Sequence, residues 1–180
     1  MTIGFCGTHG VGKTTLADMV NEEFDCMFNR NMSYQRILND IGLPINDKAD
    51  ILTQAGVLAN YYIDLFRYRR DEVLLTDRTI IDALAYTFNS DSISDDNKNI
   101  LYSYYAKAIP MYDILFYIPI EFGLVKDDVR QEDEQYRLNI DNEIQRLLKI
   151  SNVKYYTVSG SIEERLEYTT KIICVERYNE

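Results

Sequence analysis

A stretch near the amino end of the chain has the residue types and the spacing of a phosphate-binding loop. Residues 7–15 read GTHGVGKTT and fit the pattern G-x-x-x-x-G-K-[ST], known as Walker A. Its glycines let the backbone curl so that successive N–H groups face a β-phosphate. Lys13 can reach the β- and γ-phosphates, and the hydroxyl of Thr14 can ligate Mg²⁺. The pattern predicts a nucleotide-binding loop made of Gly7, Thr8, His9, Gly10, Val11, Gly12, Lys13, Thr14 and Thr15.

The segments around this loop fit the same interpretation. Residues 2–6 are predicted to form a short buried strand, and residues 13–24 a helix whose amino end adds partial positive charge beneath the anion. His9, the single histidine of the chain, occupies a variable position of the pattern and is interpreted as a spacer. One histidine also argues against a Ser/His/Asp catalytic set and excludes a histidine-based metal site.

Asp77 and Arg78 follow a short apolar run, residues 72–76, which predicts a buried parallel strand. A carboxylate at such a strand end can hold a metal-bound water near Mg²⁺ or take a proton from an attacking hydroxyl. Arg78 suits bidentate contact with a phosphate. In the alternative interpretation, Asp77 is the N-cap of the following helix. Because the chain also carries Walker A, we favour a catalytic and metal-binding Asp77 and a substrate-binding Arg78.

A charged segment later in the chain carries two further candidate arginines. Residues 123–134 are polar and strongly charged, without an apolar period, and predict a flap, or lid, that reaches to about residue 137. Phosphoryl transfer spreads negative charge over the moving group, so Arg130 and Arg137 can stabilise the transition state when the flap closes. The spacing fits equally well a solvated loop whose arginines pair with nearby acidic side chains.

Tyr34 and Arg36 come after a weak strand candidate at residues 25–30. At that position they can line an acceptor pocket, with the aromatic ring stacking on a base. Because the chain holds 15 tyrosines, a core or surface role fits Tyr34 at least as well.

Strands and helices alternate along the whole chain. The remaining predicted elements are strands at residues 114–118 and 153–158 and helices at residues 33–41, 50–69, 80–88, 97–109, 136–148 and 161–178. This alternation predicts one α/β domain over residues 1–180, with a parallel sheet and helices on both faces. Ligands of such sheets bind beyond the carboxyl ends of the strands, where the loop, Asp77–Arg78 and the Pro119 turn are expected to meet.

Composition limits the classes of function. The net charge is −10, which counts against a broad nucleic-acid-binding surface because phosphate contacts need clustered Lys and Arg. No apolar run approaches the roughly 20 residues that a membrane span needs. The amino end shows no charged-then-apolar signal pattern. We therefore expect a cytoplasmic protein without a membrane partner.

Three segments, GTHGVGKTTL, LLTDRTIIDALAY and DDVRQEDEQYRLNIDNEI, occur in this order along the chain. Together they resemble the small AAA_28-type P-loop kinases, which are close to the thymidylate-kinase and deoxynucleoside-kinase group and to ribosylnicotinamide-kinase domains. Many such kinases are encoded by phages, which would place the protein in the host cytoplasm. The resemblance covers most of the chain, from residue 1 to about residue 150.

The resemblance implies a P-loop NTPase fold, a three-layer α/β/α sandwich with a five-stranded parallel sheet and a short lid. It implies ATP and Mg²⁺ as cofactors and a nucleoside, a nucleotide or a similar small molecule as the acceptor. By position, it makes Lys13 and Thr14 the ligands of ATP–Mg²⁺ and Asp77 the acid near the metal and the acceptor. It makes Arg78 a contact of the acceptor or of a phosphate, and Arg130 and Arg137 arginines of the lid. The Arg-Glu-Pro acceptor segment of thymidylate kinases has no match around residues 30–36, which counts against thymidylate as the acceptor.

Two other functions stay open. One is a kinase that acts on a hydroxymethylpyrimidine base within DNA, against which the net charge counts. The other is a regulatory P-loop NTPase or GTP-dependent switch, although the guanine-reading sequence Asn-Lys-x-Asp is absent. A homodimer also stays open.

Overall fold

The computed structural model describes residues 1–24, 28–30, 41–67, 73–121 and 134–178 of the chain. Its centre is a five-stranded sheet with the order β2-β3-β1-β4-β5, in which every strand pair is parallel. The strands are β1 (Thr2–Cys6), β2 (Phe28–Arg30), β3 (Val73–Thr76), β4 (Ile114–Tyr117) and β5 (Tyr155–Thr157). Because the strands run in one direction, all their carboxyl ends lie at the same edge of the sheet.

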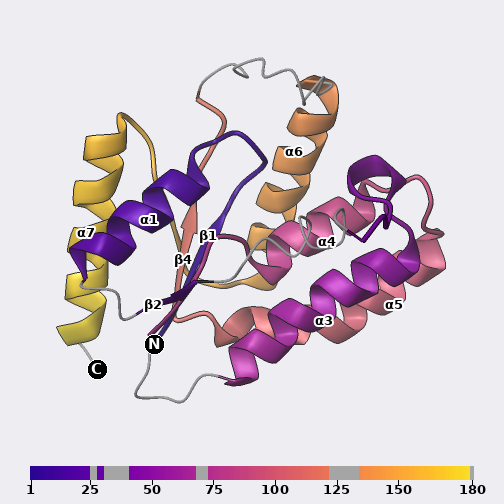
Figure 1. Ribbon diagram of the computed structural model, residues 1–180, viewed down its shortest axis with the longest axis horizontal. Coiled ribbons are helices and arrows are strands. Elements are labelled where there is room, and N and C mark those ends of the chain that lie inside the picture. Colours follow the sequence, from indigo (N-terminus) through magenta and orange to yellow (C-terminus); the bar gives the residue numbers. More distant parts are fainter. Residues whose placement is uncertain (25–27, 31–40, 68–72, 122–133, 179–180) are drawn as a thin grey trace.

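The helices form two layers, one on each face of the sheet (Figure 1). They are α1 (Lys13–Glu23), η1 (Asn46–Lys48), α3 (Ile51–Arg67), α4 (Ile80–Phe88), α5 (Asp95–Tyr105), η2 (Ala106–Met111), α6 (Glu134–Ser151) and α7 (Ile162–Tyr178). Helices α1 and α7 cover one face and pack against each other, while α3, α4, α5 and α6 cover the other. The predicted α/β/α sandwich is therefore confirmed. None of the described helices is long and apolar enough to span a membrane.

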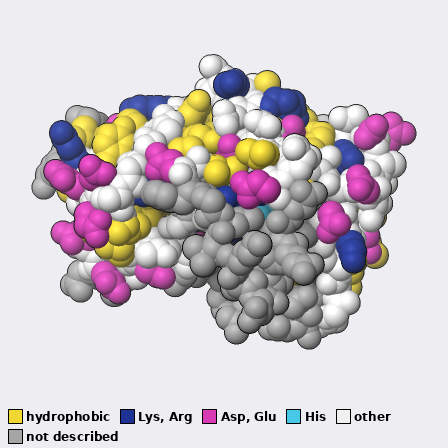
Figure 2. Space-filling model, turned by 90° about the horizontal axis from the view of Figure 1, so that it is seen from above, with side chains coloured by type: hydrophobic (Ala, Val, Ile, Leu, Met, Phe, Trp, Pro, Cys, Tyr) yellow, Lys and Arg dark blue, Asp and Glu magenta, His cyan; other side chains and the backbone are white. Residues whose placement is uncertain are grey.

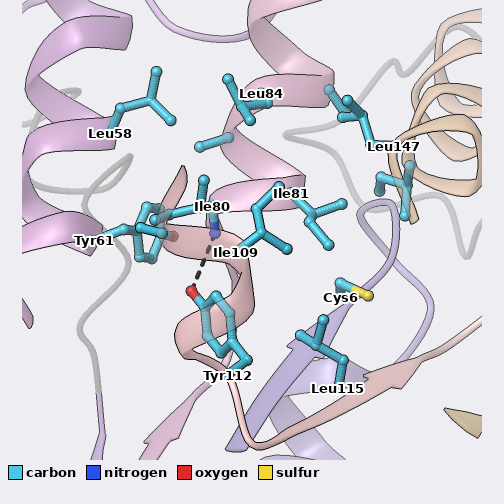
Figure 3. Packing of buried hydrophobic residues seen from close by; sticks show 14 of the residues in the cluster. Cys6, Leu58, Tyr61, Ile80, Ile81, Leu84, Ile109, Tyr112, Leu115 and Leu147 are labelled. Atoms are coloured by element: carbon cyan, nitrogen blue, oxygen red, sulfur yellow. Dashed lines mark hydrogen bonds between the residues drawn. The ribbon is translucent and has the colours of Figure 1, made fainter. Parts of the chain in front are cut away.

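Hydrophobic clusters fill the space on both sides of the sheet. On the α1–α7 side, the rings of Phe5 and Phe116 stack with their centroids 5.3 Å apart. On the other side, α4 lies in the middle of the cluster and points Ile80, Ile81 and Leu84 into it (Figure 3). Each fully buried Leu or Ile contributes about 1.5–3 kcal/mol. Helix α4 therefore cannot shift against the sheet without a large loss of stability.

The start of α4 is fixed by polar contacts as well. The hydroxyl of Tyr112 accepts a hydrogen bond from the N–H of Ile80, the first residue of the helix, at 3.2 Å (Figure 3). Thr79 is the N-cap, and its side chain accepts from the N–H of Asp82. Helix α4 follows Asp77 and Arg78 directly, so these contacts also fix the chain segment that carries both residues.

Element boundaries match the predictions closely except near Pro110. A helix was predicted at residues 97–109, but α5 begins at Asp95 because the Ser94 side chain caps it by accepting from the N–H of Asn97. After Tyr105 the chain tightens into the 3-10 helix η2, which contains Pro110. Proline has no N–H to donate to an α-helical turn, which explains why the α-helix does not continue. Of the predicted helix at residues 33–41, only residue 41 lies within the described residues.

Candidate active site

The segments singled out by the sequence meet at one edge of the sheet. The loop at residues 7–12 follows β1, Asp77 and Arg78 follow β3, and Ile118 follows β4. These three strands are neighbours in the order β3-β1-β4. The loop and the Asp77–Arg78 segment are in direct contact, because the hydroxyl of Thr14 donates to the Asp77 carboxylate at 2.7 Å.

Gly7 and Gly12 show why the loop conformation requires glycine. A Cβ on Gly7 would lie 2.5 Å from the carbonyl oxygen of Ile118, so no larger residue fits there. Gly12 has a φ of 89° in the left-handed region, which glycine adopts without strain. It is the N-cap of α1 and makes no side-chain cap. The N–H groups at the start of α1, with the partial positive charge of the helix, therefore face the space inside the loop.

Two buried arginines, one in α6 and one in α7, donate hydrogen bonds to carbonyl oxygens of the loop. Arg137 in α6 donates to the carbonyl oxygens of His9 at 3.2 Å and Gly10 at 3.5 Å. Arg165 in α7 donates to the carbonyl oxygen of Val11 at 2.8 Å. In a trans peptide the C=O and the following N–H point in opposite directions. The arginines therefore turn the N–H groups of residues 10–12 away from themselves, which is the arrangement an anion inside the loop requires.

Arg165 is held by further contacts. Its guanidinium donates to the carbonyl oxygen of Gly160 at 2.9 Å and forms an ion pair with Glu121 at 2.7 Å. The Glu121 carboxylate also accepts from the N–H of Gly160. Side-chain hydrogen bonding to Arg165 helps to hold the pKa of Glu121 below its usual value, against the effect of burial. Glu121 after β4 and Gly160 after β5 thus hold Arg165 in place, and Arg165 in turn holds the loop.

We predict that Arg165→Lys raises the dissociation constant for ATP about tenfold, because one ammonium cannot replace the three directed contacts of the guanidinium. Isothermal titration calorimetry measures the constant. Arg177→Lys is the matched control, since Arg177 is an exposed residue in the last turn of the same helix. Equal ATP affinity in Arg165→Lys and wild type would contradict a role of this arginine in shaping the loop.

Lys13 folds back over the loop. Its ammonium nitrogen donates to the carbonyl oxygens of Gly7 and Thr8, each 2.5 Å away, and the residue is 5% exposed. Burial, followed by repulsion from Arg78, lowers the pKa of Lys13 to about 8. The attraction of Asp82 and Asp77 opposes this fall in pKa. The cation therefore lies inside the curl of the loop, where a bound phosphate would meet it.

The Thr14–Asp77 pair suits Mg²⁺ in the type of its atoms. A hydroxyl and a carboxylate oxygen meet at 2.7 Å, and Mg²⁺ prefers oxygen ligands. Within the described residues, no group of three or more His, Cys, Asp or Glu side chains forms a dedicated metal cage. Mg²⁺ bound with a nucleotide needs none, because phosphates and water supply the other ligands. The residues present therefore fit a metal that arrives with the nucleotide.

The N-cap interpretation of Asp77 is wrong, because Thr79 caps α4. Asp82, which sequence analysis missed, completes this capping box and also reaches the loop. One of its carboxylate oxygens accepts from the N–H and hydroxyl of Thr79 at 2.8 and 2.7 Å, and the other accepts from the N–H of Gly7 at 3.1 Å. Burial raises the pKa of Asp82, and the nearby Lys13 and Arg78 oppose the rise. The spacing Thr79-x-x-Asp82 was the available signal for the cap.

Arg78, the residue after Asp77, packs against an aromatic ring of α4. Its guanidinium carbon is 5.4 Å from the centre of the Tyr86 ring. Its Nη1 atom is buried and has no hydrogen-bond partner among the described residues. A buried charged donor without an acceptor is costly, and an anionic or hydroxyl-bearing ligand would satisfy it.

Some of the predicted site residues lie outside the described residues. These are Tyr34, Arg36, Arg130 and residues 123–133 of the predicted lid. Residues 134–137, the last part of that lid, instead form the first turn of α6. Arg137 is fully buried there, and its predicted place in a lid is corrected: it holds the loop carbonyls and lies 3.6 Å from Glu134.

Figure 2 looks onto the edge of the sheet at which the loop lies. On the described part of this face, Lys and Arg side chains stand apart from one another among acidic side chains and form no continuous basic patch. A nucleic-acid-binding surface needs clustered Lys and Arg. The positive charge of the site is instead buried and local, on Lys13, Arg137 and Arg165.

A family model described as an AAA domain, AAA_28, matches residues 2–165 of the chain. No curated protein sequence matches the chain.

Several solved structures share the fold at low identity. Deoxyadenosine kinase from M. mycoides with dCMP and dCDP is 14% identical, covers 97% of this chain and 100% of its own, and gives a TM-score of 0.72. Thymidylate kinase from Ehrlichia chaffeensis is 17% identical, with 96% and 98% covered and a TM-score of 0.64. The NadR protein in complex with NR is 16% identical, with 96% of this chain but 50% of that chain covered and a TM-score of 0.77. The chain thus has the P-loop kinase fold that its sequence predicts.

Proposed function

The chain belongs to the AAA_28 family, and from this premise we propose that it is a kinase that uses ATP and Mg²⁺ to phosphorylate a nucleoside or a nucleoside monophosphate. The contact between Thr14 in the loop helix and Asp77 after β3 carries the proposal. This hydrogen bond joins the phosphate-binding loop, which suits a triphosphate, to the segment after β3, which suits a metal and an acceptor. The names of the structural neighbours, deoxyadenosine kinase and thymidylate kinase, support the class of acceptor.

The donor side of the site binds the triphosphate through main-chain N–H groups. Arg137 and Arg165 keep the N–H groups of residues 10–12 turned inward, and the start of α1 adds its partial charge. Lys13 leaves the carbonyl oxygens of Gly7 and Thr8 to contact the β- and γ-phosphates. Thr14 and Asp77 would hold Mg²⁺, which would neutralise part of the negative charge of the phosphates.

The acceptor side is formed by Asp77 and Arg78. The acceptor oxygen forms a bond to the γ-phosphorus while the bond from that phosphorus to the bridging oxygen breaks, and ADP leaves with the bridging oxygen. When the acceptor is a hydroxyl, its proton passes to the Asp77 carboxylate. Arg78 donates to the acceptor through Nη1, the atom that has no partner among the described residues.

A panel of acceptors tests the proposal. ATP with radiolabelled γ-phosphate and Mg²⁺ is offered with nucleosides, with nucleoside monophosphates and with DNA that contains hydroxymethylpyrimidines. We expect label on at least one nucleoside or monophosphate and little loss of ATP when no acceptor is present. Label on the DNA alone would identify a DNA-base kinase. Hydrolysis of ATP that no acceptor changes would identify a regulatory NTPase.

Arg78→Lys tests the acceptor side. We expect kcat/KM for the acceptor to fall about tenfold while the dissociation constant for ATP stays within about twofold, because a lysine keeps the charge but loses the planar fork. Steady-state kinetics at varied acceptor concentration and calorimetry with ATP measure the two constants. The matched control is Arg146→Lys, since Arg146 also lies over an aromatic ring, that of Phe88, but pairs with Glu143 on the exposed surface of α6. A loss confined to ATP affinity would contradict the acceptor role.

A further inference from the structure

A cluster of three rings joins three segments that carry site residues. His9 belongs to the loop, Tyr86 to α4 and Tyr136 to α6. The ring centroids are 6.4 Å apart for His9–Tyr86, 6.4 Å for His9–Tyr136 and 6.3 Å for Tyr86–Tyr136. His9 and Tyr86 are 7% and 2% exposed. His9 is therefore not a bare spacer of the Walker A pattern, because its side chain is packed and bonded inside the protein.

Tyr86 contacts both the loop and the segment after β3 through its ring and its hydroxyl, and the hydroxyl also takes part in a side-chain hydrogen bond with Arg78. Its hydroxyl is hydrogen-bonded to Nδ1 of His9 at 2.9 Å. Its ring lies 5.4 Å below the guanidinium carbon of Arg78. A stacked Arg is restrained in the plane of its guanidinium, and a bonded histidine is restrained in its ring orientation. One tyrosine thus touches both the loop that would hold the phosphate donor and the arginine that would hold the acceptor.

A second contact from the same face of α4 acts on the same loop. Asp82 lies one turn before Tyr86, and residues four apart share a helix face. Its carboxylate accepts from the N–H of Gly7 at 3.1 Å, two residues before His9. This face of α4 therefore contacts the first half of the loop at two points. The carbonyl oxygens further along are held from α6 and α7 by Arg137 and Arg165.

We propose that Tyr86 is a positioning residue for phosphoryl transfer. It fixes the position of the Arg78 guanidinium relative to His9 of the loop. The inference rests on the proposed function, because it assigns donor and acceptor to these two segments. Transfer needs the two oxygens in line at the phosphorus, and a displacement of about 1 Å can lower a rate about 10²-fold. Two groups on different loops reach that accuracy when a rigid element holds both. Helix α4, buried along residues 80–87, is such an element.

Tyr86→Phe tests the inference because it keeps the ring under Arg78 and removes only the hydroxyl. We expect kcat to fall about five- to tenfold, because the buried hydrogen bond to His9 and the hydroxyl's contact with Arg78 are lost together. The dissociation constant for ATP is expected to stay within about twofold, because Lys13 and both arginines still shape the loop. Rates are measured with the best acceptor of the panel or, if wild type phosphorylates none, as hydrolysis of ATP. If wild type phosphorylates no acceptor, the proposed function fails. If Tyr86→Phe keeps the wild-type rate, this inference fails.

His9 variants identify the partner of the hydroxyl. His9→Ala should lower kcat, though by no more than Tyr86→Phe, which also removes the hydroxyl's contact with Arg78, and the double variant should lose no more than Tyr86→Phe alone. His9→Asn should restore most of the rate, because the Asn amide can place a hydrogen-bonding atom near the position of Nδ1. Fully additive losses in the double variant would overturn the inference.

Tyr117→Phe is the matched control for a purely structural effect. Tyr117 is also a buried tyrosine, 5% exposed, and its hydroxyl donates to the Asp141 carboxylate at 2.9 Å. Its loss should lower the melting temperature without changing kcat at a temperature where both variants are folded. The inference is wrong if Tyr86→Phe keeps the wild-type kcat, or if Tyr117→Phe loses as much activity as Tyr86→Phe.

Discussion

Lys13→Ala is expected to lower the rate of phosphoryl transfer about 10³-fold, into the background of the assay, because the γ-phosphate loses the cation that neutralises its developing charge. The position of Lys13 explains the size of this effect. The side chain is buried inside the loop, and its ammonium group already contacts the loop's own carbonyl oxygens. No other lysine of the described residues is placed there to replace it. Transfer of radiolabelled γ-phosphate to the best acceptor measures the rate.

The control for this variant separates chemistry from folding. Lys149→Ala makes the same change at an exposed position in the last turn of α6 and should keep the wild-type rate. Thermal melting shows whether Lys13→Ala still folds, which matters because the carbonyl oxygens of Gly7 and Thr8 lose their donor. A folded Lys13→Ala variant with normal turnover would remove the central assignment of the loop.

The loop and the segment after β3 could be predicted because their signals are local in the sequence. Walker A is read from nine consecutive residues, 7–15, with a strand before it and a helix after it. Asp77 and Arg78 were found because they end an apolar run. Alternating strands and helices then required both segments to lie at one edge of a parallel sheet. The structure confirms that edge, with β3 and β4 on either side of β1.

The residues that shape the loop from outside could not be predicted. Arg165 lies 154 residues from Val11, whose carbonyl oxygen it holds, and Arg137 lies 128 residues from His9. No local pattern marks such a contact, because it depends on how helices from the end of the chain pack on the sheet. The charged neighbours of Arg137 indicated either a closing lid or a solvated loop, whereas its place in the first turn of α6 buries it completely.

His9 and Asp82 show a second limit of local patterns. Both sit within recognisable motifs, a Walker A loop and a capping box, and each motif accounts for the residue fully by itself. In the fold, His9 also contacts Tyr86 and Asp82 also contacts Gly7, and neither motif predicts these contacts. A residue explained by one local rule can thus carry a second contact that only the fold creates.

Asp77→Asn is expected to lower phosphoryl transfer about 10²-fold, whether the carboxylate acts as a proton acceptor or as the oxygen that steadies Mg²⁺. The amide keeps the size of the side chain and can still accept the hydrogen bond from Thr14, so the geometry of the pair is preserved. What is removed is one negative charge beside the metal. The concentration of Mg²⁺ that gives half-maximal activity should therefore rise, and a titration of activity with Mg²⁺ measures it.

Stability distinguishes this role from that of a helix cap. Loss of a true N-cap lowers stability by about 0.5–2 kcal/mol, and Thr79 holds that position in α4. The melting temperature of Asp77→Asn should therefore stay near that of wild type. Asp113→Asn is the matched control at the opposite edge of the sheet, where its carboxylate accepts from the N–H of Thr2 at 2.6 Å. If Asp77→Asn kept the wild-type rate and Mg²⁺ requirement, the carboxylate after β3 would have no part in the transfer, and the contact with Thr14 would serve only to join β3 to α1.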